Sequence, residues 1–178
     1  DFRLMSSGPR CGFEEINLPE SLKSIGKSAF TSTAIEEISF PEGITVISDG
    51  VVAYCRQLKR VYIPESVEVI GKNAFCETDI SEVTLPSRLR EIGDNAFVYC
   101  DGIKNIQLGD KLETIGEGVF TYCSSLESII IPDSVVSLGS VSFRECTNLK
   151  SVSLSENIKV IGLMTFYGCV NLTEIKIP

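Results

Sequence analysis

PSRLREIGDNAFVYCDGIKNIQL, residues 86–108, carries the pattern that decides the fold. Within it, apolar residues such as Ile92, Phe97 and Ile106 stand at fixed intervals, and near-copies of 22 or 23 residues precede and follow it. A fixed period in this range is typical of a solenoid, in which each repeat buries its apolar face only against its neighbours. The seven copies begin at Pro19, Pro41, Pro64, Pro86, Gly109, Pro132 and Ser155, and Pro178 would open an eighth.

The segment before each proline corner alternates between apolar and polar side chains. In the second copy, Val61 and Ile63 are apolar, while Arg60 and Tyr62 are the outward positions. Period-two alternation with β-branched residues is typical of a half-buried strand. The proline that follows lacks an N–H and ends the ladder. Stacked once per repeat, these strands predict a parallel sheet along one wall of the solenoid.

A shorter apolar pair and a glycine follow each corner. In the third copy these residues are Val67, Ile70 and Gly71, and a recurring glycine indicates either a positive φ or a close backbone approach. The next residues, such as 72–75, are too few for an independent α-helix. We expect them to form a single 3₁₀ or α turn whose Phe points back into the core.

Phenylalanine and cysteine recur three residues apart in most copies. Phenylalanines stacked at this regularity predict a structural spine rather than a ligand cage. We expect buried free thiols, because stacked side chains point the same way whereas a disulfide needs Cβ atoms that face each other. Copies one and three are one residue shorter and carry Thr33 and Thr78, whose hydroxyls can bond nearby backbone and close a tighter turn. Copy two has Val52 in place of Phe, which predicts lower local stability. The Phe column is Phe30, Phe75, Phe97, Phe120, Phe143 and Phe166, and the Cys column is Cys55, Cys100, Cys123, Cys146 and Cys169.

Composition limits the classes of function. The 178 residues are 43% hydrophobic with a formal net charge of -8, which predicts one packed domain and argues against a nucleic-acid partner. No apolar run approaches the ~20 residues that span a bilayer, so we expect no membrane insertion within this chain. No signal peptide is visible at residues 1–11. The chain has no His, no Gly-x-Ser-x-Gly and no phosphate loop, so we expect no enzyme activity, no catalytic residue, no cofactor and no metal site.

The composite pattern Pro-x-x-Leu-x-x-Ile-Gly-x-x-Ala-Phe-x-x-Cys-x-x-Leu-x-x-Ile-x-Leu resembles the BspA-type leucine-rich repeat over residues 13–178. The resemblance implies an α/β repeat solenoid: a right-handed coil with a concave parallel β-sheet and short 3₁₀ or helical turns on the convex side. It also implies a cell-surface or secreted protein, in a family linked to adhesion and virulence in host-associated bacteria and some mucosal protozoa. It carries over no catalytic residue.

The outward strand positions form the candidate binding surface, because a rigid parallel wall presents its side chains in rows. These rows are mostly polar and uncharged, which suits a host protein or a glycan as partner. Tyr62 and Ile130 are the best anchors, since aromatic and apolar anchors tend to dominate interface energetics. The alternative is that the rows are an ordinary solvated strand face. The candidate partner-binding residues are Arg60, Tyr62, Thr84, Asn105, Gln107, Ile130 and Ser153.

Three functions are compatible with this sequence. The first is an extracellular adhesion module; the second is an intracellular interaction scaffold, since free thiols suit a reducing compartment; the third is a structural spacer in a larger surface protein. We expect a tail or partial cap at residues 1–12 and a single domain of seven repeats at residues 13–178. Because the last strand has no polar cap, we expect either further repeats beyond residue 178 or end-to-end packing on another copy.

Overall fold

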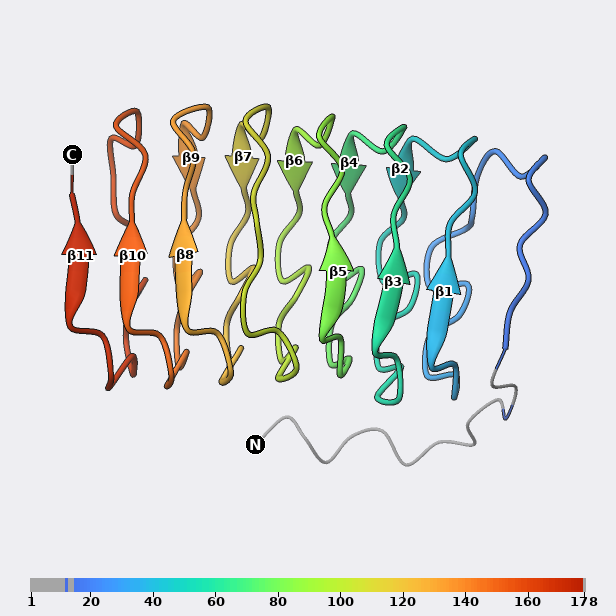
Figure 1. Ribbon diagram of the computed structural model, residues 1–178, viewed down its shortest axis with the longest axis horizontal. Coiled ribbons are helices and arrows are strands. Elements are labelled where there is room, and N and C mark those ends of the chain that lie inside the picture. Colours follow the sequence, from blue (N-terminus) through green and yellow to red (C-terminus); the bar gives the residue numbers. More distant parts are fainter. Residues whose placement is uncertain (1–11, 13–14, 178) are drawn as a thin grey trace.

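The computed structural model describes residues 12 and 15–177 and shows a parallel-strand β-solenoid of about six turns. Successive coils lie side by side along the long axis of the molecule (Figure 1). Each coil contributes to three walls. The long-strand wall carries three-residue strands, the short-strand wall carries two-residue strands, and the turn wall joins the second kind to the first. The turn wall comprises residues 26–33, 48–55, 71–78, 93–100, 116–123, 139–146 and 162–169.

The long-strand wall confirms the predicted half-buried strands. Val61, in the middle of β3, is buried, whereas its neighbours Arg60 and Tyr62 face outward, because successive side chains of a strand point to opposite faces. Equivalent residues of neighbouring copies pair in parallel register, as Val61 does with Val83. The strands of this wall are β1 (Glu37–Ser39), β3 (Arg60–Tyr62), β5 (Glu82–Thr84), β8 (Ser128–Ile130), β10 (Ser151–Ser153) and β11 (Glu174–Lys176).

The ladder of the long-strand wall is interrupted once. The sheet β1-β3-β5 ends at β5, and the sheet β8-β10-β11 begins at β8. Residues 103–108 lie between them and form only an isolated parallel bridge, Asn105 with Ser128. Gly102 precedes this segment, and a Cβ at Gly102 would fall 2.6 Å from the carbonyl oxygen of Ile80 in the preceding copy. The backbones of the two copies therefore approach closely at Gly102, directly before the segment that interrupts the sheet.

The short-strand wall is a second, continuous parallel sheet that the sequence did not lead us to expect. Its five strands pair in the order β2-β4-β6-β7-β9 and run opposite to the long strands, behind them in Figure 1. Each holds one residue of the apolar pair after the corner, as Ile70 does in β4. The strands are β2 (Val46–Ile47), β4 (Val69–Ile70), β6 (Glu91–Ile92), β7 (Thr114–Ile115) and β9 (Ser137–Leu138).

The turn wall contains no helix within the described residues, so the prediction of 3₁₀ or helical turns is wrong. Each copy has two residues with positive φ four positions apart, such as Asn73 (φ 54°) and Glu77 (φ 53°). Their N–H groups donate to the carbonyls of Asp94 and Val98 in the next coil. A helix directs its N–H groups along its own axis, whereas here alternate N–H groups leave the coil. The turn wall is therefore a third hydrogen-bonded ladder between coils.

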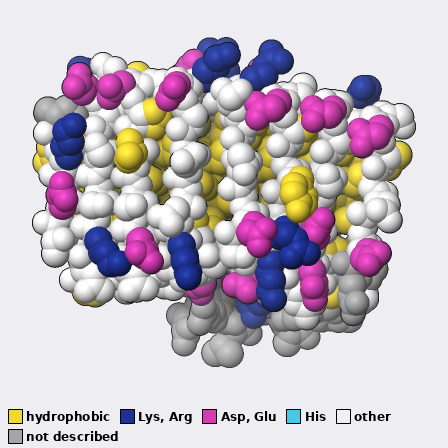
Figure 2. Space-filling view, in the orientation of Figure 1, with side chains coloured by type: hydrophobic (Ala, Val, Ile, Leu, Met, Phe, Trp, Pro, Cys, Tyr) yellow, Lys and Arg dark blue, Asp and Glu magenta, His cyan; other side chains and the backbone are white. Residues whose placement is uncertain are grey.

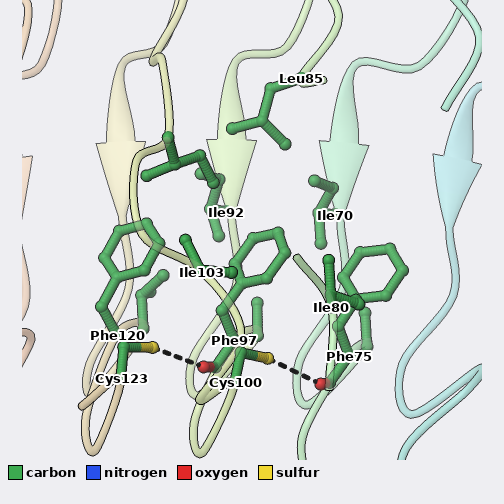
Figure 3. Close-up of a cluster of buried hydrophobic side chains, with 14 of the residues drawn as sticks. Ile70, Phe75, Ile80, Leu85, Ile92, Phe97, Cys100, Ile103, Phe120 and Cys123 are labelled. Atoms are coloured by element: carbon green, nitrogen blue, oxygen red, sulfur yellow. Dashed lines mark hydrogen bonds between the residues drawn. The ribbon is translucent and has the colours of Figure 1, made fainter. Parts of the chain in front are cut away.

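Stacked phenylalanines and cysteines fill the core, as predicted (Figure 3). The rings of Phe75, Phe97, Phe120, Phe143 and Phe166 stack in sequence with centroids 5.1–5.8 Å apart. The six described cysteines are all free. Each thiol of the Cys column donates a hydrogen bond to the Phe carbonyl of the preceding coil, for example Cys123 Sγ to Phe97 O at 3.1 Å. Burial raises the pKa of Cys100 to about 12.

The threonines of the two short copies act as expected. The Thr33 hydroxyl donates to the Phe30 carbonyl at 3.0 Å, and the Thr78 hydroxyl donates to the Phe75 carbonyl at 2.8 Å. Each bond spans three residues within one coil and closes the shortened turn. In copy two, Val52 is fully buried. Lower stability of that copy stays a prediction.

Close approach to the preceding coil explains the glycine that opens the turn segment from the third copy to the seventh, at Gly71, Gly93, Gly116, Gly139 and Gly162. A Cβ at Gly116 would lie 2.7 Å from the backbone nitrogen of Asp94, whereas a Cβ at Gly26, in the first coil, would meet nothing within 4 Å. Neither residue has positive φ. Ser48 occupies this position in copy two, and its hydroxyl donates to the Ile25 carbonyl at 2.5 Å.

Alternating charges stack directly after these glycines. Lys27 Nζ lies 2.7 Å from Asp49 Oδ2, and Lys72 Nζ lies 2.7 Å from Asp94 Oδ2. The hydrogen bond from Lys27 is the main cause that lowers the pKa of Asp49, and the hydrogen bond from Lys72 does the same for Asp94. These two ion pairs therefore favour the ionised form of both aspartates.

The two ends of the chain differ in how much of them is described. Of the expected tail or cap at residues 1–12, all but residue 12 lie outside the described residues, as do Phe13 and Pro178. In the last coil, Leu163, Val170 and Ile177 are exposed. End-to-end packing stays a prediction.

Candidate binding surface

The long-strand wall presents the predicted rows of outward side chains. Pairing places Tyr62 beside Thr84, and Ile130 beside Ser153. Tyr62 is 52% exposed and Ile130 is 71% exposed, so both offer apolar surface to a partner. Figure 2 shows this wall as mostly polar and uncharged, with charged side chains gathered near its upper and lower edges.

The interruption of the ladder divides the seven candidate residues. Arg60, Tyr62 and Thr84 lie on β3 and β5, on one side of it. The other four, Asn105, Gln107, Ile130 and Ser153, lie on residues 103–108 and on β8 and β10. Tyr62 and Ile130 therefore belong to separate parts of the wall and do not form one anchor pair.

A groove of about 870 Å³ brings together three of the candidates, Asn105, Gln107 and Ile130. Asn105, Gln107 and Ile130 stand at outward positions of their segments, so the two amides and the Ile130 side chain line the groove together. Tyr62 and Thr84 do not line this groove. Its remaining lining residues are Ile106, Leu108, Asp110, Ser128, Ile129, Pro132, Asp133 and Ser134.

The sequence analysis did not identify the groove residues that follow the corners, Asp110, Asp133 and Ser134. Ser134 Oγ is buried and has no hydrogen-bond partner, although buried hydroxyls nearly always have one. Asp110 and Asp133 add two carboxylates, and no Lys or Arg lines the groove. Gly109, the one glycine at a corner position otherwise held by Pro or Ser, was the available signal that this corner differs.

Arg60 is already paired. Its Nε donates to Glu37 Oε2 at 2.7 Å across β1 and β3, and this hydrogen bond is the main cause that raises the Arg60 pKa. Arg60 and Glu37 line a second, smaller hollow of about 400 Å³ with Glu15, Ile16, Asn17, Glu36 and Ser39. This hollow is polar and acidic.

The groove exposes an apolar side chain, amide groups and carboxylates that a partner can contact. Among the described residues, no group of three or more Asp, Glu, Cys or His side chains is placed to hold a metal ion. In the same part of the chain, no helix is long and apolar enough to cross a bilayer.

Known proteins with this repeat identify the family. A model of the BspA type leucine rich repeat region matches residues 9–102 and 68–178 in six copies. The chain belongs to this family. Leucine-rich repeat solenoids of this kind typically act as protein-interaction scaffolds without catalytic activity. No curated protein matches the chain significantly.

Solved structures of bacterial leucine-rich repeat proteins share the architecture. The T. pallidum leucine-rich repeat protein TpLRR is 33% identical, with a TM-score of 0.77 over 79% of this chain and 69% of its own. A leucine-rich repeat protein from Bacteroides ovatus is 26% identical, with a TM-score of 0.60 over 94% of this chain and 60% of its own. The pneumococcal vaccine antigen PcpA is 24% identical, with a TM-score of 0.62, and shows the fold alone; this chain covers 41% of its length.

Proposed function

We propose that this BspA-type repeat chain is a non-catalytic adhesion module that binds a host protein or a glycan on its long-strand wall. Membership of the family supports the binding role, and the family's link to adhesion supports a location at the cell surface. The carrying observation is the groove beside Ile130, where an exposed apolar side chain adjoins a buried hydroxyl without a partner.

The groove has the chemistry of a small binding site. Ile130 supplies an apolar anchor, the amides of Asn105 and Gln107 supply donors and acceptors, and Ser134 Oγ lacks a bond that a partner would complete. The two carboxylates on its rim favour a partner that carries hydrogen-bond donors or a positive charge. Such sites are mostly apolar with a few placed polar groups.

The test is binding of the purified chain to an array of extracellular-matrix proteins and glycans. Ile130→Ala should weaken binding about tenfold, which corresponds to ~1.4 kcal/mol. Val136→Ala is the matched control, because Val136 is exposed to a similar degree but lies outside the groove. Tyr62→Ala, in the same assay, shows whether the sheet β1-β3-β5 also contributes to binding. Binding that survives the combined Ile130→Ala and Tyr62→Ala changes would remove this wall from consideration, and no binding at all would favour a spacer.

Ser134→Ala separates a binding role from a structural one. Because Ser134 Oγ has no partner in the free protein, its removal should leave the free energy of unfolding unchanged or slightly higher. The same change should weaken partner binding if a partner completes the bond. A loss of stability with unchanged binding would contradict the proposed role of this hydroxyl.

A further inference from the structure

Arg144 on the turn wall is held between two tyrosines of the neighbouring coils. Its guanidinium carbon lies 5.7 Å from the ring centroid of Tyr122 and 5.5 Å from that of Tyr167. Tyr122 also stacks on Tyr99, with centroids 4.4 Å apart. A guanidinium within about 6 Å of an aromatic ring is attracted to its face. The Arg144 guanidinium therefore lies between the two rings.

Arg144 differs from the other described arginines because it has no carboxylate partner. Arg56 pairs with Glu77, and the remaining three pair with glutamates of adjacent coils: Arg60 with Glu37, Arg88 with Glu68, and Arg90 with Glu113. Within residues 12 and 15–177, Arg144 makes no ion pair, and its Nε is buried without an acceptor. A buried donor in this state is unfavourable until something accepts its hydrogen bond.

We propose that Arg144 binds the carboxylate of an Asp or Glu side chain on a protein partner. A guanidinium offers parallel N–H groups that match a carboxylate in a two-point bond. Turn-wall residues 116–123, 139–146 and 162–169 contain no other Lys or Arg and also carry Glu117 and Glu145, so the site does not favour an anion with more than one charge. A singly charged carboxylate suits this better than a phosphate does.

A protein partner fits this position better than a glycan. Tyr122 has one face on Tyr99 and the other on Arg144, so it offers no free aromatic face to a sugar, whereas Tyr167 contacts Arg144 and is 55% exposed. Tyrosine and arginine are the residue types that most often dominate protein–protein interfaces. The site lies on the turn wall and is separate from the groove at Ile130. Its test therefore does not depend on whether the groove binds a partner.

The experiment follows the Nε–Hε signals of the ¹⁵N-labelled full chain by NMR. Arg144→Lys identifies the Arg144 signal by its loss. The probes are two blocked tripeptides, acetyl-Ala-Glu-Ala-amide and its Gln counterpart. We expect the Glu peptide to shift the Arg144 signal saturably at millimolar concentration, and the Gln peptide to leave it in place. The Arg90 signal is the internal control, because Arg90 already donates to Glu113 Oε1 at 2.6 Å.

Tyr167→Ala tests the positioning role of the aromatic pair. It removes one ring from the Arg144 guanidinium and should weaken binding of the Glu peptide severalfold without removing the signal. Equal shifts with both peptides, or none with either, would overturn the proposal. Shifts with sodium glucuronate but not with the Glu peptide would overturn the choice of a protein partner.

Discussion

Replacing Phe97 by alanine tests whether the stacked rings stabilise the coils. Phe97 is fully buried, with Phe75 at 5.1 Å on one side and Phe120 at 5.7 Å on the other. Truncating a buried Phe to Ala costs ~3–5 kcal/mol, and each aromatic pair adds ~0.5–1.5 kcal/mol beyond burial. The Phe97 N–H is fixed to the Val119 carbonyl at 3.0 Å, so the backbone has little freedom to close the cavity. We expect a loss of about 5 kcal/mol in the free energy of unfolding.

Phe166→Ala is the matched control. Phe166 is only partly buried and stacks on one ring, Phe143, at 5.8 Å. Its loss should be about half as large, ~2–3 kcal/mol. Urea unfolding followed by circular dichroism measures both variants, with hydrogen exchange to show whether the coils unfold together. Equal losses for the two variants, or a loss below ~2 kcal/mol for Phe97→Ala, would refute the account of the core.

Four further predictions concern the backbone, the charges and the thiols. Gly116→Ala should lower the free energy of unfolding by ~1–3 kcal/mol because its Cβ would press on the backbone of Asp94, whereas Gly26→Ala should change it little; equal effects in urea unfolding would contradict this. Val141→Gly should raise the melting temperature, since a β-branched residue at φ 53° is strained, and a lower value would show that side-chain packing outweighs strain. Because the pKa of Asp94 is lowered in the folded chain, its carboxylate stabilises the fold above the ordinary aspartate pKa, and this stabilisation is lost as pH falls through the lowered value. In the Asp94→Asn variant, the melting temperature should therefore depend less on pH in this range. Cys100 should resist thiol reagents at pH 8 until the chain unfolds, because burial raises its pKa to about 12; rapid labelling of the folded chain would contradict its burial.

Repetition made much of the fold predictable. The long strands, the Phe spine and the free cysteines follow from positions that recur in nearly every copy, and stacking puts equivalent positions in contact. The turn wall was predicted wrongly because residue count alone does not separate a helical turn from a turn with positive φ. Gly50, Gly118 and Asn73 at the positive-φ positions were the available signal, since Gly and Asn adopt this region most readily.

The second sheet was missed for a different reason. A strand of two residues is too short to show a period of two, so only its pairing with adjacent coils defines it. The rows of the candidate surface were predictable from alternation. The groove was not, because it depends on where the sheet of long strands is interrupted, and residues 103–108 carry the same apolar spacing as the strands on either side.

The central claim is that the recurring columns serve folding and that the groove at Ile130 serves binding. Hydrogen exchange of the chain, free and bound to the strongest binder on the protein and glycan array, tests it most directly. The account predicts slower exchange on binding at residues 105–110 and 128–134, with the short-strand wall unchanged. Protection confined to β2, β4, β6, β7 and β9 would contradict it.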